Sequence, residues 1–217
     1  LCLFVTALLA LPSLAGAATY YVGQGAGDSD ANSCASAQTD AAGSRKATAA
    51  SAVGCLASGD TLTVKAGTYG GASLQDPNIP NGTAAAWTKF TCQAGVIFRP
   101  TTGTHVFSMQ QSTRDIRYIE WDGCEFDGVN LVGYGFKVGT GTQDTLMNGP
   151  LRLKNSTIRN AANSGMTFGA CDACDFTAST VRETGTTSAD HGVYFGPMKN
   201  SLVQGVLFLN NKSDGLA

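Results

Sequence analysis

The residues with the clearest chemical potential lie near the carboxyl end of the sequence: Arg182, Asp190, His191, Lys199 and Asp214. An imidazole or an amine can remove the proton next to a carboxylate, while a guanidinium neutralises the enolate-like charge that develops. With His191 or Lys199 as base and Arg182 as the cation, this set predicts an elimination, and Asp190 or Asp214 could supply oxygen ligands for Ca²⁺. Asp190 and Asp214 are also the one pair of carboxylates that we nominate for hydrolysis of a glycosidic bond.

A sequence repeat sets the positions of these residues. Four segments share a glycine followed by alternating apolar residues, and they span 134–139, 164–169, 191–196 and 214–217. Ahead of them lie two apolar columns, one formed by Phe126, Ile158, Val181 and Phe208, the other by Trp121, Leu153, Phe176 and Val203. The shortest repeat unit is about 23 residues, and loop insertions explain the longer units.

A unit of this length with three short strands is typical of one rung of a solenoid. A single rung cannot bury its apolar face, whereas stacked rungs pair each strand in parallel with its equivalent about 4.8 Å away. We therefore predict an all-β solenoid of parallel strands, with apolar stacks inside and glycines at the bends. No amphipathic helix lies between the repeated strands, which argues against an α/β fold.

The upstream sequence predicts how this solenoid begins. Residues 20–22 are typical of an opening strand, the alanine-rich segment 46–58 of a helix, and 60–69 of a strand that ends in a turn. Because terminal rungs need a cap, we expect the helix to cover the open end of the solenoid. The predicted organisation is 1–17 export signal, 18–70 opening strand and capping helix, and 71–217 rungs. Since Ala217 falls inside the fourth glycine strand, we expect a C-terminally truncated solenoid with further rungs beyond it.

Stacking also predicts neighbours for the chemical residues. The column just before each glycine consists of Tyr134, Ser164, His191 and Asp214. His191 and Asp214 should therefore lie one rung apart, at about 5 Å, where a hydrogen bond between them would raise the histidine pKa. The loop 181–192 is longer than its counterparts and carries Arg182 and Asp190, and extended loops on a rigid ladder favour a functional site.

Each candidate also has a purely structural interpretation. A histidine at the start of a turn is more often a surface or ladder residue. Arg182 shares an outward column with Arg159 and Asp127, which a solvated charge ladder explains adequately. Another outward column consists of Lys137, Thr167 and Tyr194, and a tyrosine there could stack on a sugar ring. The catalytic assignment of these residues is therefore a hypothesis.

The first 17 residues indicate export. They are apolar, carry no charge and end in Ala15-Gly16-Ala17, a pattern that is typical of a secretory signal and too short for a membrane span. We expect cleavage near Ala17 and a secreted chain, either extracellular or periplasmic, with no membrane association after cleavage.

The cysteines agree with this compartment. Removal of the signal takes Cys2 from the seven cysteines and leaves six, an even number that favours disulfides in an exported protein. A small structural disulfide between Cys171 and Cys174 is favoured over a zinc half-site or a redox pair, because the chain offers no second such pair and no βαβ context. Cys34 and Cys55 are expected to form a disulfide that connects the loop before the helix to the helix itself.

The charge balance and the amino-acid composition exclude some classes of function and favour one kind of structure. The net charge is −2, with 14 Lys and Arg against 16 Asp and Glu, which argues against nucleic acid as a partner. Charged residues make up only 14%, where about 25% is typical, and the chain has 27 glycines. This balance favours short strands and tight turns. No cofactor motif is evident, Ca²⁺ is permitted, and nothing in the sequence indicates the oligomeric state.

These features resemble the right-handed parallel β-helix superfamily of exported, mostly bacterial proteins that share the pectate-lyase-like fold. Segments 18–22 and 58–69 are similar to its N-terminal module, and 155–160 and 191–195 to its rung consensus. The resemblance spans about residues 18–217 and implies a right-handed helix with an N-terminal cap. The superfamily contains pectate and alginate lyases, polygalacturonases, epimerases, phage tailspikes and catalytically silent surface proteins. The motifs of polygalacturonases and alginate epimerases are missing here, so the resemblance assigns no catalytic residue.

Two functions follow as expectations. The first is an exported β-helix that binds or processes polysaccharide, as a lyase or hydrolase of acidic glycans, because a long polar outer face matches an extended chain ligand. The alternative is a non-catalytic cell-surface or adhesion β-helix. A fold hosts many functions, so the choice between them depends on the site.

Overall fold

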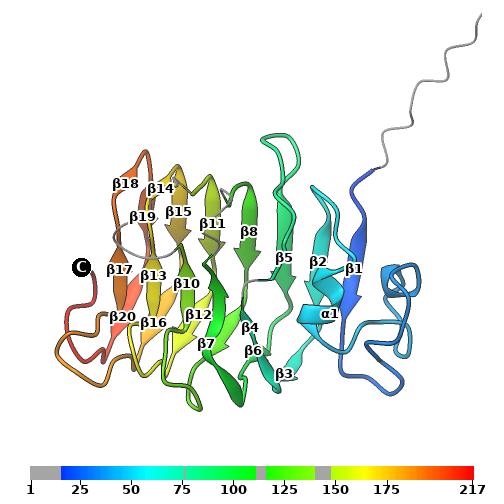
Figure 1. Cartoon of the computed structure of the whole chain (residues 1–217), viewed down its shortest axis with the longest axis horizontal. Helices are drawn as coiled ribbons and strands as arrows, with labels where there is room; N and C mark the ends of the chain where they lie inside the picture. Colours follow the sequence, from blue (N-terminus) through cyan, green and yellow to red (C-terminus); the bar gives the residue numbers. More distant parts are fainter. Residues whose placement is uncertain (1–15, 76, 111–115, 140–147) are drawn as a thin grey trace, which may run out of the picture.

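Three parallel sheets run side by side along the described chain and enclose one core (Figure 1). The computed structural model describes residues 16–217 except 76, 111–115 and 140–147. Successive strands pass from one sheet to the next, so the chain forms a parallel β-solenoid of about five turns. The predicted all-β fold of stacked parallel rungs is therefore confirmed. Most of the segment 1–17, predicted as the export signal, lies outside the described residues.

The strands of each sheet follow one another rung by rung. Sheet A contains, in spatial order, β1 (Thr19–Val22), β2 (Thr61–Val64), β5 (Thr88–Cys92), β8 (Ile119–Asp122), β11 (Leu151–Lys154), β15 (Cys174–Thr177) and β19 (Leu202–Gln204). Sheet B contains β3 (Gly67–Tyr69), β6 (Val96–Phe98), β9 (Glu125–Asp127), β12 (Thr157–Arg159), β16 (Thr180–Arg182) and β20 (Leu207–Leu209). Sheet C contains β4 (Ala72–Gln75), β7 (Thr102–Met109), β10 (Phe136–Val138), β13 (Met166–Phe168) and β17 (Val193–Phe195). A short pair, β14 (Cys171–Asp172) and β18 (Met198–Lys199), lies at the corner between sheets C and A.

The strand register confirms the predicted columns. Leu153 pairs with Trp121 on one side and Phe176 on the other, and Ile158 lies in the same way between Phe126 and Val181. The first rung already begins with β2 and β3, inside the segment 18–70, because these strands pair with β5 and β6. The alternation of apolar and polar residues along each strand therefore becomes an inward and an outward face.

An aromatic cluster fills the middle of the core. Phe107 and Phe136 stack with ring centroids 4.8 Å apart. Trp121 from sheet A and Phe126 from sheet B each approach Phe136 at 5.1 Å, edge to face. All four side chains are at most 2% exposed. Residues from all three sheets thus meet at one point, which ties the rungs of sheets A, B and C to each other.

The corner residues adopt backbone conformations that suit asparagine. Asn155 and Asn160 have φ values of 50° and 54°, in the left-handed region that asparagine tolerates better than most residues. The side chain of Asn155 donates to Asp122 at 2.8 Å, and that of Asn160 donates to Asp127 at 2.9 Å. Each corner is therefore tied to the rung before it by a side-chain hydrogen bond.

The N-terminal end carries the helix, but the helix is shorter than predicted. The helix α1 spans Ala49–Val53, and the 3₁₀ turn η1 spans Ser36–Gln38. Both elements contact β1, and Figure 1 shows α1 at this end of the solenoid. The Thr48 hydroxyl accepts a hydrogen bond from the Ser51 N–H and caps the start of α1. Lys46, predicted as helical, instead pairs with Val22 of β1 as an isolated bridge.

Three disulfides connect the six cysteines: Cys34–Cys55, Cys92–Cys124 and Cys171–Cys174. The first joins the N-terminal loop to the segment after α1, as predicted. The second connects two successive rungs. Disulfides of this number are consistent with an oxidising, extracellular type of environment. Within the described residues, we find no helix whose length and apolar character would let it span a membrane.

Candidate functional site

The structure distributes the predicted catalytic residues over different parts of the solenoid. Arg182 ends β16 in sheet B, whereas Lys199 lies in β18 at the corner between sheets C and A. Asp190 and His191 lie directly before β17. The Gly192 N–H donates to the Asp214 carbonyl at 2.9 Å, so Asp214 does stack one rung from His191, as predicted. Among the described residues, however, no hydrogen bond joins the His191 and Asp214 side chains.

The Asp190 carboxylate accepts its hydrogen bonds from residues of its own loop. Its Oδ2 accepts hydrogen bonds from the N–H groups of Thr186 and Thr187, at 2.9 and 2.6 Å, and from the Thr187 hydroxyl at 2.9 Å. Burial raises the pKa of the Asp190 carboxyl, but these donors and the nearby charge of His191 outweigh burial and hold the pKa below its usual range. A buried carboxylate with this role orders the loop between β16 and β17 and places His191 at the start of β17.

The Arg182 side chain also has a partner within the chain. Its guanidinium donates to the neighbouring Glu183 carboxylate at 2.6 Å. In the register of sheet B, Arg182 follows Arg159 and Asp127, which confirms the predicted outward column. Arg159 in turn contacts Asp127 at 3.0 Å, and Arg99 contacts the same carboxylate at 2.7 Å. This side of sheet B is therefore a ladder of paired charges.

The outer face of sheet C gathers a different set of side chains. The strand register places two columns next to each other on this face. One column consists of His105, Tyr134, Ser164 and His191, and the other consists of Ser108, Lys137, Thr167 and Tyr194. We call these eight residues the sheet C face. Both histidines of the chain belong to it, together with two tyrosines and a lysine.

Ring contacts connect the two columns. The Lys137 Nζ lies 4.7 Å from the centroid of the Tyr134 ring, on its face. The Tyr134 ring lies 5.1 Å from the His105 ring, and further along the solenoid the His191 and Tyr194 rings are 6.1 Å apart. The sheet C face therefore presents a cation on an aromatic ring, with a second ring pair two rungs away.

Three polar atoms on this face are buried without a hydrogen-bond partner. They are Ser108 Oγ, Thr167 Oγ1 and His191 Nδ1, and the described residues contain only two other such atoms. Ser108 is fully buried and Thr167 is 5% exposed, and their strands pair with the β10 strand of Lys137 on either side. Because buried polar groups are nearly always paired, this concentration of unpartnered atoms distinguishes the sheet C face from the other described surfaces.

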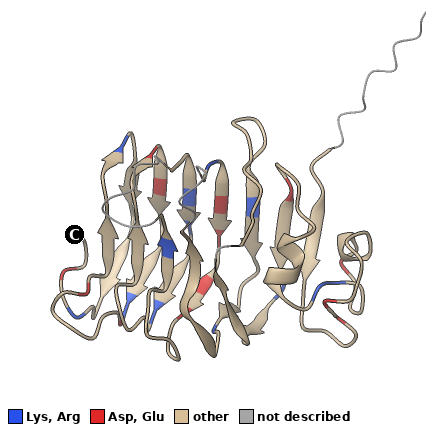
Figure 2. Ribbon diagram, viewed as in Figure 1, with Lys and Arg blue, Asp and Glu red and all other residues tan. Residues whose placement is uncertain are grey.

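The outer face of sheet A carries a charge pattern that the sequence repeats did not reveal. Its outward column reads Lys89, Glu120, Arg152 and Asp175, so the sign alternates from rung to rung. Figure 2 shows this alternation as bands of opposite colour across β5, β8, β11 and β15. Arg152 contacts both carboxylates, Glu120 at 3.6 Å and Asp175 at 3.3 Å. The Trp87 ring covers the Arg152 guanidinium at 3.9 Å. Glu120, Arg152 and Asp175 therefore neutralise one another, which makes this part of sheet A a structural charge ladder.

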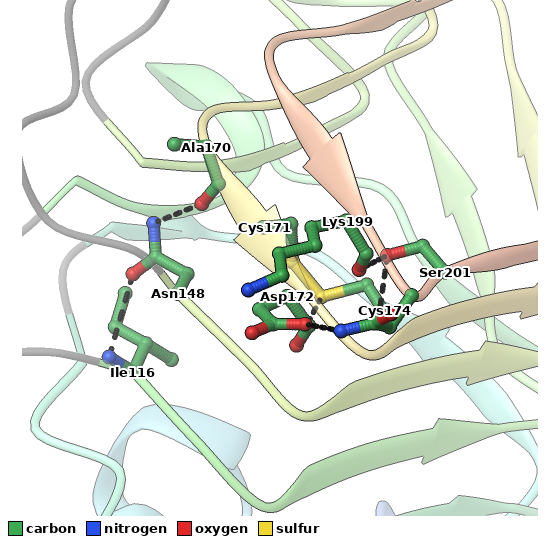
Figure 3. Close-up of a disulfide and its surroundings, with 9 residues drawn as sticks. Ile116, Asn148, Ala170, Cys171, Asp172, Cys174, Lys199 and Ser201 are labelled. Carbon is green, nitrogen blue, oxygen red and sulfur yellow. Dashed lines mark hydrogen bonds between the residues drawn. A yellow bond between two sulfur atoms is a disulfide. The ribbon is translucent and has the colours of Figure 1, made fainter.

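The pair Cys171 and Cys174 closes a corner of the solenoid (Figure 3). Cys171 is fully buried and Cys174 is 3% exposed, so the disulfide lies inside the corner between β14 and β15. The neighbouring Asp172 accepts a hydrogen bond from Asn200 at 2.9 Å, and Lys199 pairs with Asp172 in the β14–β18 register. The predicted structural disulfide is confirmed over a zinc half-site.

No group of three or more His, Cys, Asp or Glu side chains in the described parts of the chain has an arrangement suited to a metal ion. The Ca²⁺ expectation therefore stays a prediction. Comparison of the chain with protein families, with curated proteins and with solved structures finds no match. The sheet C face, identified from its own geometry, is the candidate functional site of this β-solenoid.

Proposed function

We propose that this chain is an exported β-solenoid protein that binds an acidic polysaccharide along the sheet C face. The observation that carries the proposal is the set of buried, unpartnered polar atoms at Ser108, Thr167 and His191. A sugar chain is rich in hydroxyls that both donate and accept hydrogen bonds, so it can supply the missing partners if binding makes these buried atoms accessible.

The geometry of the face suits an extended and negatively charged chain. Equivalent positions on stacked parallel strands recur about every 4.8 Å in a straight line, which suits a linear polymer that runs along the solenoid axis. Lys137 supplies an ammonium between the two hydroxyl-bearing positions Ser108 and Thr167, and an ammonium is a suitable partner for a carboxylate. Tyr134 and Tyr194 add flat apolar surface for sugar rings. Uronic acid units match this combination.

The resemblance of the rung sequences to the pectate-lyase-like β-helix superfamily supports the glycan assignment. That superfamily acts mostly on polysaccharides, and its fold agrees with the observed parallel solenoid. The disulfides and the apolar segment 1–17 support an exported location, where such polymers occur.

The first test replaces the cation of the face. We expect Lys137→Met to weaken binding of oligogalacturonate or oligomannuronate about tenfold or more, because a hydrogen bond to a charged group is worth about 1.5–3 kcal/mol. The matched control is Lys89→Met on the exposed outer face of sheet A, which should bind as the unmodified protein does. Isothermal titration calorimetry against both acidic oligosaccharides and a neutral oligosaccharide measures the effect. Equal losses in both variants, or binding of the neutral chain alone, would contradict the proposal.

His191 is the residue that we assign to catalysis, if the bound glycan is cleaved. The His191 side chain is half-buried on the sheet C face and its Nδ1 has no hydrogen-bond partner, so the imidazole could take the proton next to a uronate carboxylate. Elimination creates an unsaturated uronate that absorbs ultraviolet light. We expect His191→Ala to lower this rate at least a hundredfold while binding through Lys137 persists. A rate that is unchanged by the substitution would remove His191 from the role.

A non-catalytic adhesion protein is the second candidate. One observation favours it: Arg182 and Asp190, predicted to join His191 in catalysis, are engaged by Glu183 and by the loop N–H groups. An adhesion protein would bind the same acidic oligosaccharides with equal dependence on Lys137 and would release no unsaturated product. The absorbance assay on intact polymer therefore separates the two candidates.

A further inference from the structure

The first strand of sheet C has a free outer edge at the N-terminal end of the solenoid. β4 is the terminal strand of its sheet, and among the described residues no strand pairs with its side away from β7. The first strands of the other two sheets have partners on that side. Lys46 forms a bridge with Val22 of β1, and the Gln24 side-chain amide donates to the Thr68 carbonyl of β3 at 2.7 Å. Within the described chain, sheet C is therefore the sheet whose first strand lacks such a partner.

The strand register shows that Gln75 directs its backbone groups to this free edge. Leu74 pairs with Phe107 of β7, but the Phe107 N–H donates to the Gly135 carbonyl of the following rung at 3.1 Å. In this parallel pair Leu74 therefore supplies the bonds to β7. Successive residues of a strand direct their backbone groups to opposite sides, so Gln75 faces outward. Unpaired backbone groups of this kind are a template for another extended chain.

Two adjoining cavities lie between this edge and the helix α1, and we call them together the α1–β4 cleft. The larger has a volume of about 530 Å³ and is lined by Ala50 and Val53 of α1 and by Leu74 and Gln75 of β4. The smaller has a volume of about 230 Å³, shares Ala50 and Leu74, and reaches inward to Tyr69. The larger volume lies within the range of known ligand sites, about 300–1,000 Å³.

The lining of the cleft is uncharged. Among the described residues that line it, none is Asp, Glu, Lys or Arg, and the polar ones are Gln24, Thr48, Ser73, Gln75 and Asn78. A charged group that entered the cleft would lose water without gaining an opposite charge, which is costly. The cleft therefore selects an occupant without charged side chains.

We propose that the α1–β4 cleft binds an extended, uncharged polypeptide segment of a partner protein, which adds one strand to sheet C along β4. The segment's backbone pairs with Gln75, and one of its apolar side chains continues the inward column of Leu74, Phe107 and Phe136. The alternating donors and acceptors of a strand edge are complementary to another strand. A second copy of this chain presents the same edge inside its own cleft, so a free segment fits better. This binding does not depend on the glycan proposed above.

The first test uses blocked five-residue peptides, in which threonine alternates with leucine or phenylalanine, as probes. Nitrogen-15 NMR of the labelled protein follows the titration. At millimolar peptide we expect saturable shifts of the β4 and α1 amide signals and slower hydrogen exchange of the Gln75 amide. Peptides with glutamate at the apolar positions should cause no such shifts. Uncharged peptides that leave the β4 signals unchanged would overturn the proposal.

The second test removes a single backbone donor from the edge. Gln75→Pro loses the N–H that faces outward but leaves the bonds of Leu74 to β7 in place, and edge strands tolerate proline at such positions. We expect peptide binding to weaken about tenfold, the upper end for one hydrogen bond. The matched control Gln75→Ala loses the same side chain but keeps the N–H, and its affinity should stay within about twofold of normal. Equal affinities of the two variants would refute backbone pairing.

N-methylated peptides keep the test decisive if Gln75→Pro does not fold. Methyl groups on alternate backbone nitrogens block one edge of the peptide and leave the other edge intact. We expect one methylated set to lose binding to the unmodified protein and the other set to retain it. Binding of both sets would exclude strand addition.

Sedimentation velocity of the unmodified protein over a range of concentrations tests the second copy as occupant. We expect a monomer signal that does not change between the unmodified protein and Gln75→Pro. A dimer that Gln75→Pro abolishes and Gln75→Ala preserves would assign the β4 edge to self-association and would overturn the assignment to a partner protein.

Discussion

Replacing Phe136 with alanine is expected to lower the free energy of unfolding by about 3–5 kcal/mol. Phe136 is fully buried and contacts Phe107 at 4.8 Å and Trp121 and Phe126 at 5.1 Å each. The alanine removes the apolar surface and leaves a cavity in a cluster to which all three sheets contribute.

Urea denaturation followed by circular dichroism and by tryptophan fluorescence measures this loss. Trp121 reports directly on the cluster, and agreement of the two signals shows whether the rungs unfold together. The control is Val132→Ala, because Val132 is 77% exposed and should change stability by less than about 0.5 kcal/mol. A loss below about 1 kcal/mol for Phe136→Ala would show that the rungs around the cluster repack independently.

The second large effect is expected at Asp127, a buried carboxylate in sheet B. Burial raises the pKa of Asp127, but hydrogen bonds from Asn160, Arg99 and the Val129 N–H, with the charge of Arg159, outweigh burial and hold the pKa below its usual range. Asp127→Ala should cost about 1–3 kcal/mol, because the Val129 N–H, the Asn160 amide and the Arg99 guanidinium lose a buried acceptor.

The lowered pKa also predicts how stability depends on pH. In the unfolded chain Asp127 titrates near pH 4, and in the folded chain it titrates lower. Its stabilising contribution is therefore complete above about pH 4 and is lost as the pH falls through the folded pKa. Asp127→Asn should remove this part of the acid dependence. Denaturation at pH 7 and pH 3 tests it, with Glu183→Gln, an exposed ion-pair partner, as the control. An unchanged acid dependence in Asp127→Asn would contradict the assignment.

The inward columns were predictable because apolar residues recur with glycine at constant spacing. Trp121, Leu153 and Phe176 fall in register as the repeats required. The helix was predicted too long because tertiary pairing overrode local preference. Lys46 forms a bridge with Val22 of β1, and its ammonium donates to the Asp30 carbonyl at 2.9 Å, which keeps it out of the helix.

The candidate site was predictable only in part. Lys137, Thr167 and Tyr194 were recognised as one outward column, and His191 as a member of the column just before the repeated glycine. His105 was missed because Val106 stands where the later rungs have glycine. This rung therefore lacks the glycine by which the repeats were recognised. The burial of Ser108 and Thr167 depends on three-dimensional packing around the sheet, which no pattern of residue types contains.

The alternating charges of sheet A have a consequence for how the chain finds its fold. A solenoid built from similar rungs can stack in the wrong order if one rung is skipped during folding. Skipping β8 would set Lys89 against Arg152, and skipping β11 would set Glu120 against Asp175, and like charges directly opposite each other destabilise a strand pair. Correct stacking sets opposite charges next to each other, whereas a skipped rung sets like charges next to each other. The charge pattern of sheet A therefore favours the correct order of the rungs during folding.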